Sequence, residues 1–292
     1  RAIANATNTS LIAVTFNTND SSVLNSHGVD KVYNINTAED SFFNVDRYSA
    51  SLVPIIEKEE ASIVVVSATA DGRYLGPILA VGAQAAYFSN VVALPSSYAP
   101  LTVKRSCFTN KAFNESVSNQ SKAVICLSSN AFGLKEQTSN AENLEGEYLV
   151  SNSTLKVTAV DKVTDKVTIA DADIVVSGGR GLKGPENWHL IEDLAAVLGA
   201  ATACSKPVSD MGWRPHSEHV GQTGKPVASN LYIAIGVSGA IQHLAGINSS
   251  KIKVVINNDP EAPFFKAADY GIVGDAFEVV PKLIQKLRAI KQ

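Results

Sequence analysis

The chain has 292 residues, of which 45% are hydrophobic and 18% charged, a composition typical of globular proteins rather than disordered or fibrous ones. This length predicts two domains, each large enough to bury its own core. The formal net charge is −3 and Lys and Arg are scattered, which argues against nucleic acid as a partner.

Cysteine usage and apolar stretches bear on the compartment. The most apolar stretch, residues 232–246, falls short of the ~20 residues that a membrane span requires and is interrupted by Gln242 and His243, so no span is predicted. Because the chain begins at Arg1 without an initiator Met, we expect an opening strand and most of a helix to be missing, and a signal or transit peptide stays open. A reducing compartment is predicted from three distant cysteines without CxxC spacing: Cys107, Cys126 and Cys204.

The first half alternates short β-branched runs with helical patterns. Small and apolar residues at helical spacing in residues 75–86 predict a crossover helix. Strands separated by helices indicate βαβ units and a mainly parallel sheet. The predicted strands are residues 11–16, 31–35, 63–67, 90–94, 101–108 and 122–127.

The composition changes between the two halves. Residues 128–146 are rich in Ser, Asn, Glu and Gly and lack an apolar period, which predicts a mobile surface connector. We therefore predict an N-terminal α/β domain in residues 1–165, with a linker near residues 128–150, and a C-terminal domain in residues 166–292.

The second half begins a new α/β unit. A buried-strand pattern in residues 172–177 is followed by a glycine cluster and an amphipathic helix in residues 188–198. Alternation of strands and helices predicts a doubly wound sheet whose ligands lie at the carboxyl ends of the strands. Further strands are predicted at 200–204, 231–236, 253–257 and 270–273, with helices at 238–244 and 276–290.

A glycine-rich loop follows the first strand of this unit. Residues 179–184 (GRGLKG) fit GxGxxG between a strand and a helix, the context of a dinucleotide fingerprint. Against NAD, no Asp or Glu stands about twenty residues further on, near Cys204, and Pro185 crowds the helix start. We favour a loop that presents Arg180 to an anionic group.

A second turn, residues 236–240 (GVSGA), resembles a nucleophile elbow. It lacks the last glycine of GxSxG, and no acid and base follow in convincing order, so serine hydrolase chemistry is disfavoured. At a strand-to-helix turn the same residues offer free backbone N–H groups, a hydroxyl and the positive end of a helix, which suit a pyrophosphate. An ordinary N-cap role for Ser238 is compatible with this hypothesis.

Two loop motifs carry chemistry-bearing side chains. Residues 216–219 (HSEH) have metal-ligand types, but without a second cluster we predict a solvated loop and no metal site. Residues 222–225 (QTGK) are too short for a phosphate loop, yet their hydrogen-bonding types suit the edge of a planar heteroaromatic ring. His243 alone would be a semi-buried structural histidine.

Five motifs taken together resemble the α subunit of electron-transfer flavoproteins, most specifically over residues 173–287. This resemblance implies an FAD in extended pose, with its isoalloxazine exposed at the junction with a β subunit and its adenine end deep in the second domain. The motifs are SGGRGLK (177–183), VGQTGK (220–225), YIAIGVSGAIQHLAG (232–246), NNDPEAP (257–263) and ADYGIVG (268–274).

The resemblance also implies site residues. Asn257 and Asp275 would hold the phosphate, ribose and adenine end of FAD, and Ala276 belongs to the same part of the cofactor set. The pyrophosphate would meet Ser238, Gly239, Ala240, Ile241 and Gln242. The flavin ring would be surrounded by Arg180, Ser205, Gln222, Thr223 and His243, with Lys206, Val220 and Gly221 completing the cofactor set. No catalytic residue is expected of the chain.

One position departs from the family. Members generally carry Arg after the serine that matches Ser205, lying over the flavin ring, whereas this chain has Lys206 and then Pro207. Lysine keeps the charge but loses the planar, bidentate guanidinium, which puts the redox tuning in doubt. A reduced flavin gains negative charge, which cationic or donor groups favour, and Arg180, Lys206 and His243 are the candidates.

The implied function is electron carriage rather than catalysis on a substrate of its own. Electrons would pass from flavin dehydrogenases, such as the acyl-CoA dehydrogenases of fatty acid β-oxidation, to a membrane quinone oxidoreductase. The expected compartment is the bacterial cytoplasm, with the mitochondrial matrix as the alternative. Three other hypotheses stay open: an NAD-binding domain of a dehydrogenase or transhydrogenase, the α subunit of an electron-bifurcating flavoprotein, and an interaction module without cofactor.

Overall fold

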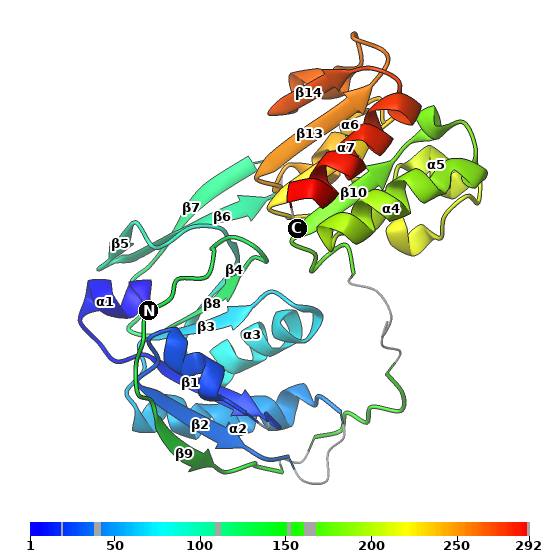
Figure 1. The fold of residues 1–292 in the computed structure, drawn as a ribbon. Helices are drawn as coiled ribbons and strands as arrows, with labels where there is room; N and C mark the ends of the chain where they lie inside the picture. Colours follow the sequence, from blue (N-terminus) through cyan, green and yellow to red (C-terminus); the bar gives the residue numbers. More distant parts are fainter. Residues whose placement is uncertain (19, 38–41, 109–111, 151–152, 161–167, 291–292) are drawn as a thin grey trace. The chain divides into compact units, whose positions relative to one another are not determined.

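The computed structural model describes residues 1–18, 20–37, 42–108, 112–150, 153–160 and 168–290, which divide into two compact units (Figure 1). The first unit comprises Arg1–Ser106 and Phe113–Asp161, and the second comprises Cys107–Ala112 and Lys162–Gln292. The predicted domain boundary, between residues 165 and 166, lies outside the described residues and stays a prediction.

The first unit holds two sheets. Strands β1, β2 and β9 form one parallel sheet in that order, and the other has the order β3-β8-β4-β6-β5, with β7 paired to β6. Helices α2 and α3 pack against each other. The elements are α1 (Ala2–Thr7), β1 (Ile12–Phe16), η1 (Ser22–Ser26), β2 (Lys31–Ile35), α2 (Val45–Lys58), β3 (Ile63–Ser67), α3 (Ala70–Gly82), β4 (Ala86–Val91), β5 (Ser97–Tyr98), β6 (Leu101–Cys107), β7 (Ala112–Ser118), β8 (Ala123–Leu127) and β9 (Glu142–Gly146).

Two sequence predictions for this unit are wrong. The strand predicted at 90–94 is β4, which runs from Ala86 to Val91 and contains a register shift between Phe88 and Val91, where Asn90 takes a φ of 54°. The predicted connector contains β9, which pairs with β2 through backbone hydrogen bonds although only Leu144 among its side chains is large and apolar. Strands β5 and β7 and helix α2 were not among the predicted elements.

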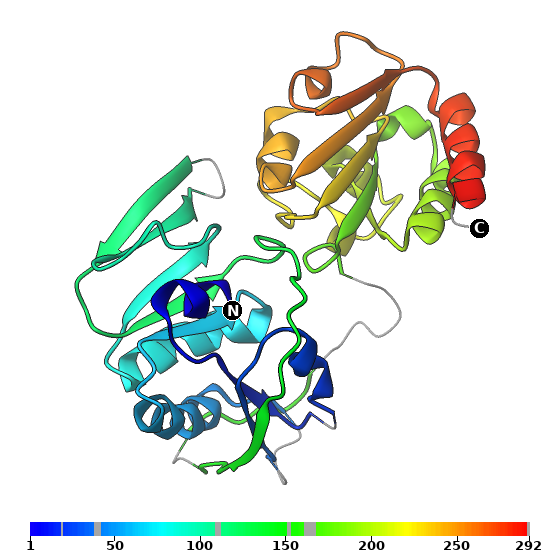
Figure 2. The same ribbon diagram turned by 60° about the vertical axis from the view of Figure 1, so that its left-hand side comes forward.

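The second unit is a parallel sheet of order β11-β10-β12-β13-β14, which confirms the predicted doubly wound fold. Helices α4 and α7 cover one face and α6 covers the other (Figure 2). The elements are β10 (Ile174–Gly178), η2 (Arg180–Leu182), η3 (Pro185–Trp188), α4 (His189–Leu198), β11 (Ala201–Cys204), α5 (Lys206–Asp210), η4 (His216–Glu218), β12 (Leu231–Ile235), α6 (Ile241–Ile247), β13 (Ile252–Asn257), η5 (Pro263–Lys266), β14 (Tyr270–Val273) and α7 (Ala276–Ile290).

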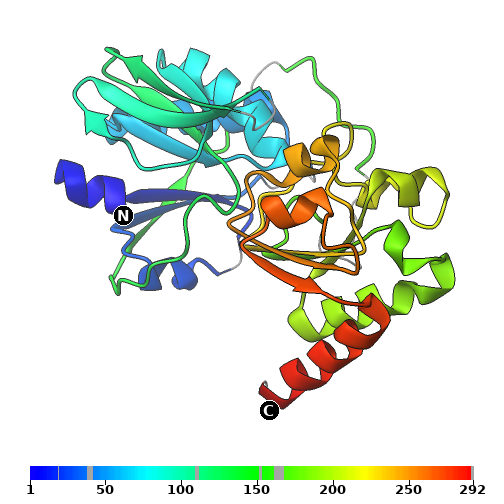
Figure 3. The same cartoon turned by 90° about the horizontal axis from the view of Figure 1, so that it is seen from above.

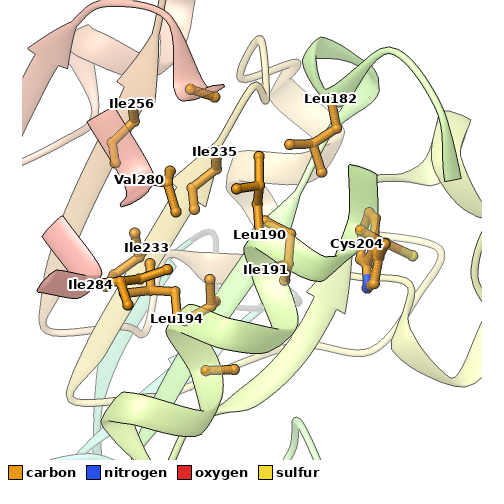
Figure 4. Close-up of a cluster of buried hydrophobic side chains, with 14 of the residues drawn as sticks. Leu182, Leu190, Ile191, Leu194, Cys204, Ile233, Ile235, Ile256, Val280 and Ile284 are labelled. Carbon is orange, nitrogen blue, oxygen red and sulfur yellow. The ribbon is translucent and has the colours of Figure 1, made fainter. Parts of the chain in front are cut away.

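Both faces of the central strands β10 and β12 are buried, whereas the edge strand β14 is exposed. On one face, α4 and α7 lie side by side (Figure 3) and place Ile191, Leu194 and Val280 on the sheet (Figure 4). On the other face, Tyr232 and Phe264 are fully buried. Strands buried on both sides are expected to be continuous apolar runs, which is what β10 and β12 are.

Helix α6 begins later than predicted. Its N-cap is Ala240, which offers no side-chain cap, so Ser238 does not take the N-cap role that was compatible with the sequence. Gly236 and Gly239 take φ values of 62° and 86°, which lie in the left-handed region. The chain therefore enters right-handed helical geometry only after Gly239. Within the described ranges, none of the helices combines the length and apolarity that a membrane span requires.

Candidate functional site

The carboxyl ends of the second unit's strands lie along one line. Gly178 of β10 is opposite both Cys204 of β11 and Ile235 of β12, while Ile235 is opposite Ile256 of β13. At a spacing of about 4.8 Å per strand, the five ends span roughly 19 Å. The predicted site residues follow these ends in the spatial order Ser205 and Lys206, Arg180, Ser238, Asn257 and Asp275.

The point at which the strand order reverses lies beside β10. The chain passes from β10 outward to β11 and returns to β12 on the other side, so the loops after β10 and β12 flank a topological switch point. Ligands of doubly wound sheets bind in the crevice at this place.

The glycine-rich loop serves close packing at this point. The N–H of Gly179 donates to the Ile235 carbonyl (2.9 Å), and the N–H of Gly181 donates to the Gly236 carbonyl (3.0 Å). A Cβ on Gly179 would lie 2.1 Å from the Gly236 oxygen. The glycines are therefore explained by the approach of two backbones, and the exposed Arg180 between them is held at the switch point.

The turn before α6 presents unused backbone donors. The N–H groups of residues 238–242 donate to no other described residue. Gly239 fixes the turn against η5, because a Cβ there would lie 2.5 Å from the Phe264 nitrogen, and the Phe264 N–H donates to the Ser238 carbonyl (3.1 Å). Free backbone N–H groups at a turn before a helix suit a phosphate.

The loop of residues 219–225 is attached to both β11 and α6. The Val220 N–H donates to the Cys204 carbonyl (3.0 Å), and the Gln222 N–H donates to the Gln242 carbonyl (2.7 Å). Gly221 is buried against Gly246, where a Cβ would lie 2.6 Å from the Gly221 Cα. These contacts bring the exposed Gln222 and Thr223 to the start of α6.

His243 is a buried, neutral group of this helix. Its Nε2 lies 3.0 Å from the Tyr232 hydroxyl, and its side chain is 6% exposed. Burial first, and then His219, lower the pKa of His243 to about 4. At neutral pH His243 therefore acts as a hydrogen-bonding group and not as a fixed cation.

Ser205 and Lys206 stand at the end of β11. Ser205 is buried, its N–H donates to the Gly178 carbonyl (3.0 Å), and its hydroxyl makes no capping bond to α5. Lys206 is exposed, and its charge is one of the factors that lower the pKa of His219. The positive charge of Lys206 therefore acts electrostatically on the loop of residues 219–225.

At the other end of the line, two predicted residues have local partners. The Asn257 amide donates to the Val237 carbonyl (3.1 Å) and accepts from the Asp259 N–H (3.0 Å). Asp275 accepts from the Phe277 N–H (3.0 Å) and so caps α7, whose first residue, Ala276, is buried. Asn257 thereby fixes the turn that carries the open N–H groups, which adds a structural role to the predicted one.

Comparison with known proteins decides the family. The model for the electron transfer flavoprotein FAD-binding domain matches residues 168–248, and that for the electron transfer flavoprotein domain matches residues 1–147. An α subunit from Bacillus subtilis is 38% identical over 270 residues, which cover 90% of this chain and 82% of the relative. The chain belongs to the electron transfer flavoprotein α-subunit family. A mitochondrial relative from Arabidopsis thaliana is 52% identical over 124 residues, 42% of this chain and 34% of that protein.

FAD is the cofactor of this family domain, and the residues present fit it. The open N–H groups of residues 238–242 suit its pyrophosphate, and the exposed amide and hydroxyl of Gln222 and Thr223 suit the edge of a flavin ring. The NAD hypothesis loses its basis, because the family domain binds FAD and two of the three fingerprint glycines, Gly179 and Gly181, pack against Gly236.

The HSEH motif contains a residue that the sequence prediction placed wrongly. His219 is only 2% exposed and is not solvated. Sequence reasoning also missed Arg214, which pairs with Glu218 through two bonds (2.8 and 2.7 Å) and stacks 5.3 Å over Trp188. The four-residue spacing of Arg214 and Glu218, which have opposite charges, is the sequence feature that could have predicted this ion pair. No group of three or more His, Cys, Asp or Glu side chains in the described part of the chain could hold a metal ion.

Proposed function

We propose that the chain carries FAD along the carboxyl edge of its second unit and relays electrons as one half of a heterodimer. The observation that supports this most is the order of groups along the edge. Side chains suited to a flavin ring follow the ends of β11 and β10, and the open N–H groups follow the end of β12. Asn257 lies at the end of β13, and Asp275 follows β14. A flexible, extended dinucleotide matches such a row.

FAD supplies the redox chemistry, and the chain supplies position and field. Arg180 and Lys206 bring positive charge to the ring end of the edge, which favours the negatively charged, reduced ring. His243 contributes a neutral hydrogen bond, because its pKa is lowered to about 4. Arg180, Ser205, Lys206, Val220, Gly221, Gln222, Thr223 and His243 form the ring end of the proposed site, residues 238–242 the centre, and Asn257, Asp275 and Ala276 the adenine end.

The proposed partners follow from the family. A β subunit would complete the dimer, flavin dehydrogenases such as acyl-CoA dehydrogenases of fatty acid β-oxidation would donate electrons, and a membrane quinone oxidoreductase would accept them. Relatives include a bacterial protein and one named mitochondrial, so the proposed compartment is the bacterial cytoplasm, with the mitochondrial matrix as the alternative.

Electron relay provides the test of this proposal. The FAD-loaded chain, copurified with its β subunit, is mixed with an acyl-CoA dehydrogenase and its acyl-CoA. Bleaching of the visible absorption band of the flavin in the chain is followed in stopped flow. We expect bleaching with the dimer and at least about tenfold slower bleaching with the α chain alone, because docking two specific patches limits association. Equal rates for the single chain and the dimer would contradict the proposed heterodimer.

A further inference from the structure

His219 is an unassigned buried residue beneath the proposed ring end. It pairs with Cys204 at the end of β11 through an isolated bridge, and its carbonyl accepts from the Lys225 N–H (2.9 Å). The loop of residues 220–225 thus leaves His219 and returns to it. Its own backbone is held one residue earlier by the bidentate pair of Glu218 and Arg214.

The loop closes over the imidazole of His219. A Cβ on Gly224 would lie 2.9 Å from Cγ and Nδ1 of the ring, and a Cβ on Gly221 would lie 3.4 Å from Nε2. Glycine at 224 therefore lets the backbone pass close to the ring, while Gly221 lies at ordinary contact distance from it. Gln222 and Thr223 stand on the exposed crest between these glycines, so the imidazole supports the residues that would meet the flavin.

The surroundings of the ring disfavour a proton. Its Nδ1 is buried and makes no hydrogen bond of good geometry among the described residues. Burial lowers the pKa of His219, His216 at 5.1 Å between ring centroids lowers it further, and Lys206 adds to this, whereas Asp210 acts in the opposite direction. His243, packed from α6, is itself neutral at pH 7 and is electrostatically coupled to His219.

We propose that His219 is a positioning residue for FAD: its neutral imidazole supports the crest that carries Gln222 and Thr223, and protonation of the ring opens this crest and weakens FAD binding in mild acid. The proposal rests on the proposed FAD site. The pair of Arg214 and Glu218 holds the preceding backbone, so a charged ring cannot leave its enclosure without displacing the loop. Bound FAD would cover the loop of residues 220–225. A protonated His219 would then have to release its proton before FAD could bind.

The test is an FAD titration of the full chain at pH 7.5, 6.5 and 5.5, followed by flavin fluorescence. We expect the wild type to bind more weakly at pH 5.5 than at pH 7.5, by at most about tenfold, since the pKa of His219 in the free chain is lowered and each pH unit below it costs up to tenfold in affinity. His219→Gln, which cannot take up the proton, should change less than about twofold over the same range.

His216→Gln is the matched control, because His216 lies in the same loop but is exposed. It should keep the acid weakening and move its midpoint to higher pH, because the His216 ring, which lowers the pKa of His219, is gone in this variant. An equal acid loss in His219→Gln and wild type would overturn the proposal, as would a wild-type affinity that stays level or tightens in acid. Absence of FAD binding at pH 7.5 would instead contradict the proposed site.

A measurement on the wild type covers the case in which His219→Gln does not fold. Ring proton resonances of His219 are followed by NMR against pH, with and without FAD. We expect a lower pKa in the FAD complex than in the free chain. An unchanged or higher pKa in the complex would overturn the proposal without any variant.

Discussion

Gly179→Ala is expected to weaken FAD binding at least about tenfold and to lower the free energy of unfolding of the second unit by about 1 to 3 kcal/mol, the usual range for overpacking. The new Cβ would lie 2.1 Å from the Gly236 oxygen and 2.8 Å from the Val237 Cα, both backbone atoms that cannot rotate away. The loop of Arg180 and the turn of residues 236–240 must therefore separate. Urea unfolding by circular dichroism and flavin titration measure the two effects.

Gly199→Ala is the matched control within the same unit. Gly199 ends α4 with a φ of 69°, and a Cβ there would meet nothing within 4 Å. The strained backbone should lower stability by about 1 kcal/mol while the affinity for FAD stays unchanged. If both variants lose FAD equally, the loss reflects general destabilisation, and the packing of the two loops is not what shapes the site.

Lys206→Ala is expected to lower the first reduction potential of the bound flavin by about 40 to 130 mV. A charge-assisted hydrogen bond to the ring is worth roughly 1 to 3 kcal/mol, and about 59 mV corresponds to 1.4 kcal/mol for one electron. Loss of this hydrogen bond destabilises mainly the reduced flavin, because the reduced form carries the negative charge. Spectroelectrochemical titration measures the potential.

Lys206→Arg is the companion variant. It should leave the potential level or raise it, because Arg keeps the charge and can also stack on the ring. The opposing hypothesis is that Pro207 turns the exposed Lys206 side chain toward solvent, where water and salt screen its charge. A first potential that is unchanged in Lys206→Ala would support that hypothesis and leave the tuning to Arg180 and His243.

The sheet of the second unit follows from local sequence. Most of its strands are short apolar runs, and the two that end at Gly178 and Ile235 are followed at once by glycine. The apolar runs and the positions where they end can therefore be recognised in the sequence. Once the strands are parallel, their carboxyl ends must share an edge. This is why residues as distant in sequence as Arg180 and Asp275 could be assigned to one site.

Other features depend on contacts that a local pattern does not contain. Ser238 has the composition of an N-cap, but the left-handed Gly239 delays the helix, and the need for that glycine arises from Phe264. His219 lies in a polar stretch and is buried only because the loop to Lys225 folds back over it. Strand β9 is polar and is specified by its partner β2.

Hydrogen–deuterium exchange tests the central claim most directly, that FAD lies along this edge with its pyrophosphate on the open N–H groups of residues 238–242. The exchange of a peptide covering residues 236–244 is compared in the free chain and with FAD, ADP or riboflavin. We predict slowed exchange with FAD and with ADP, which carries the diphosphate, and little change with riboflavin, which lacks it. Saturating FAD, verified by its fluorescence, that leaves exchange in residues 236–244 unchanged would contradict the account.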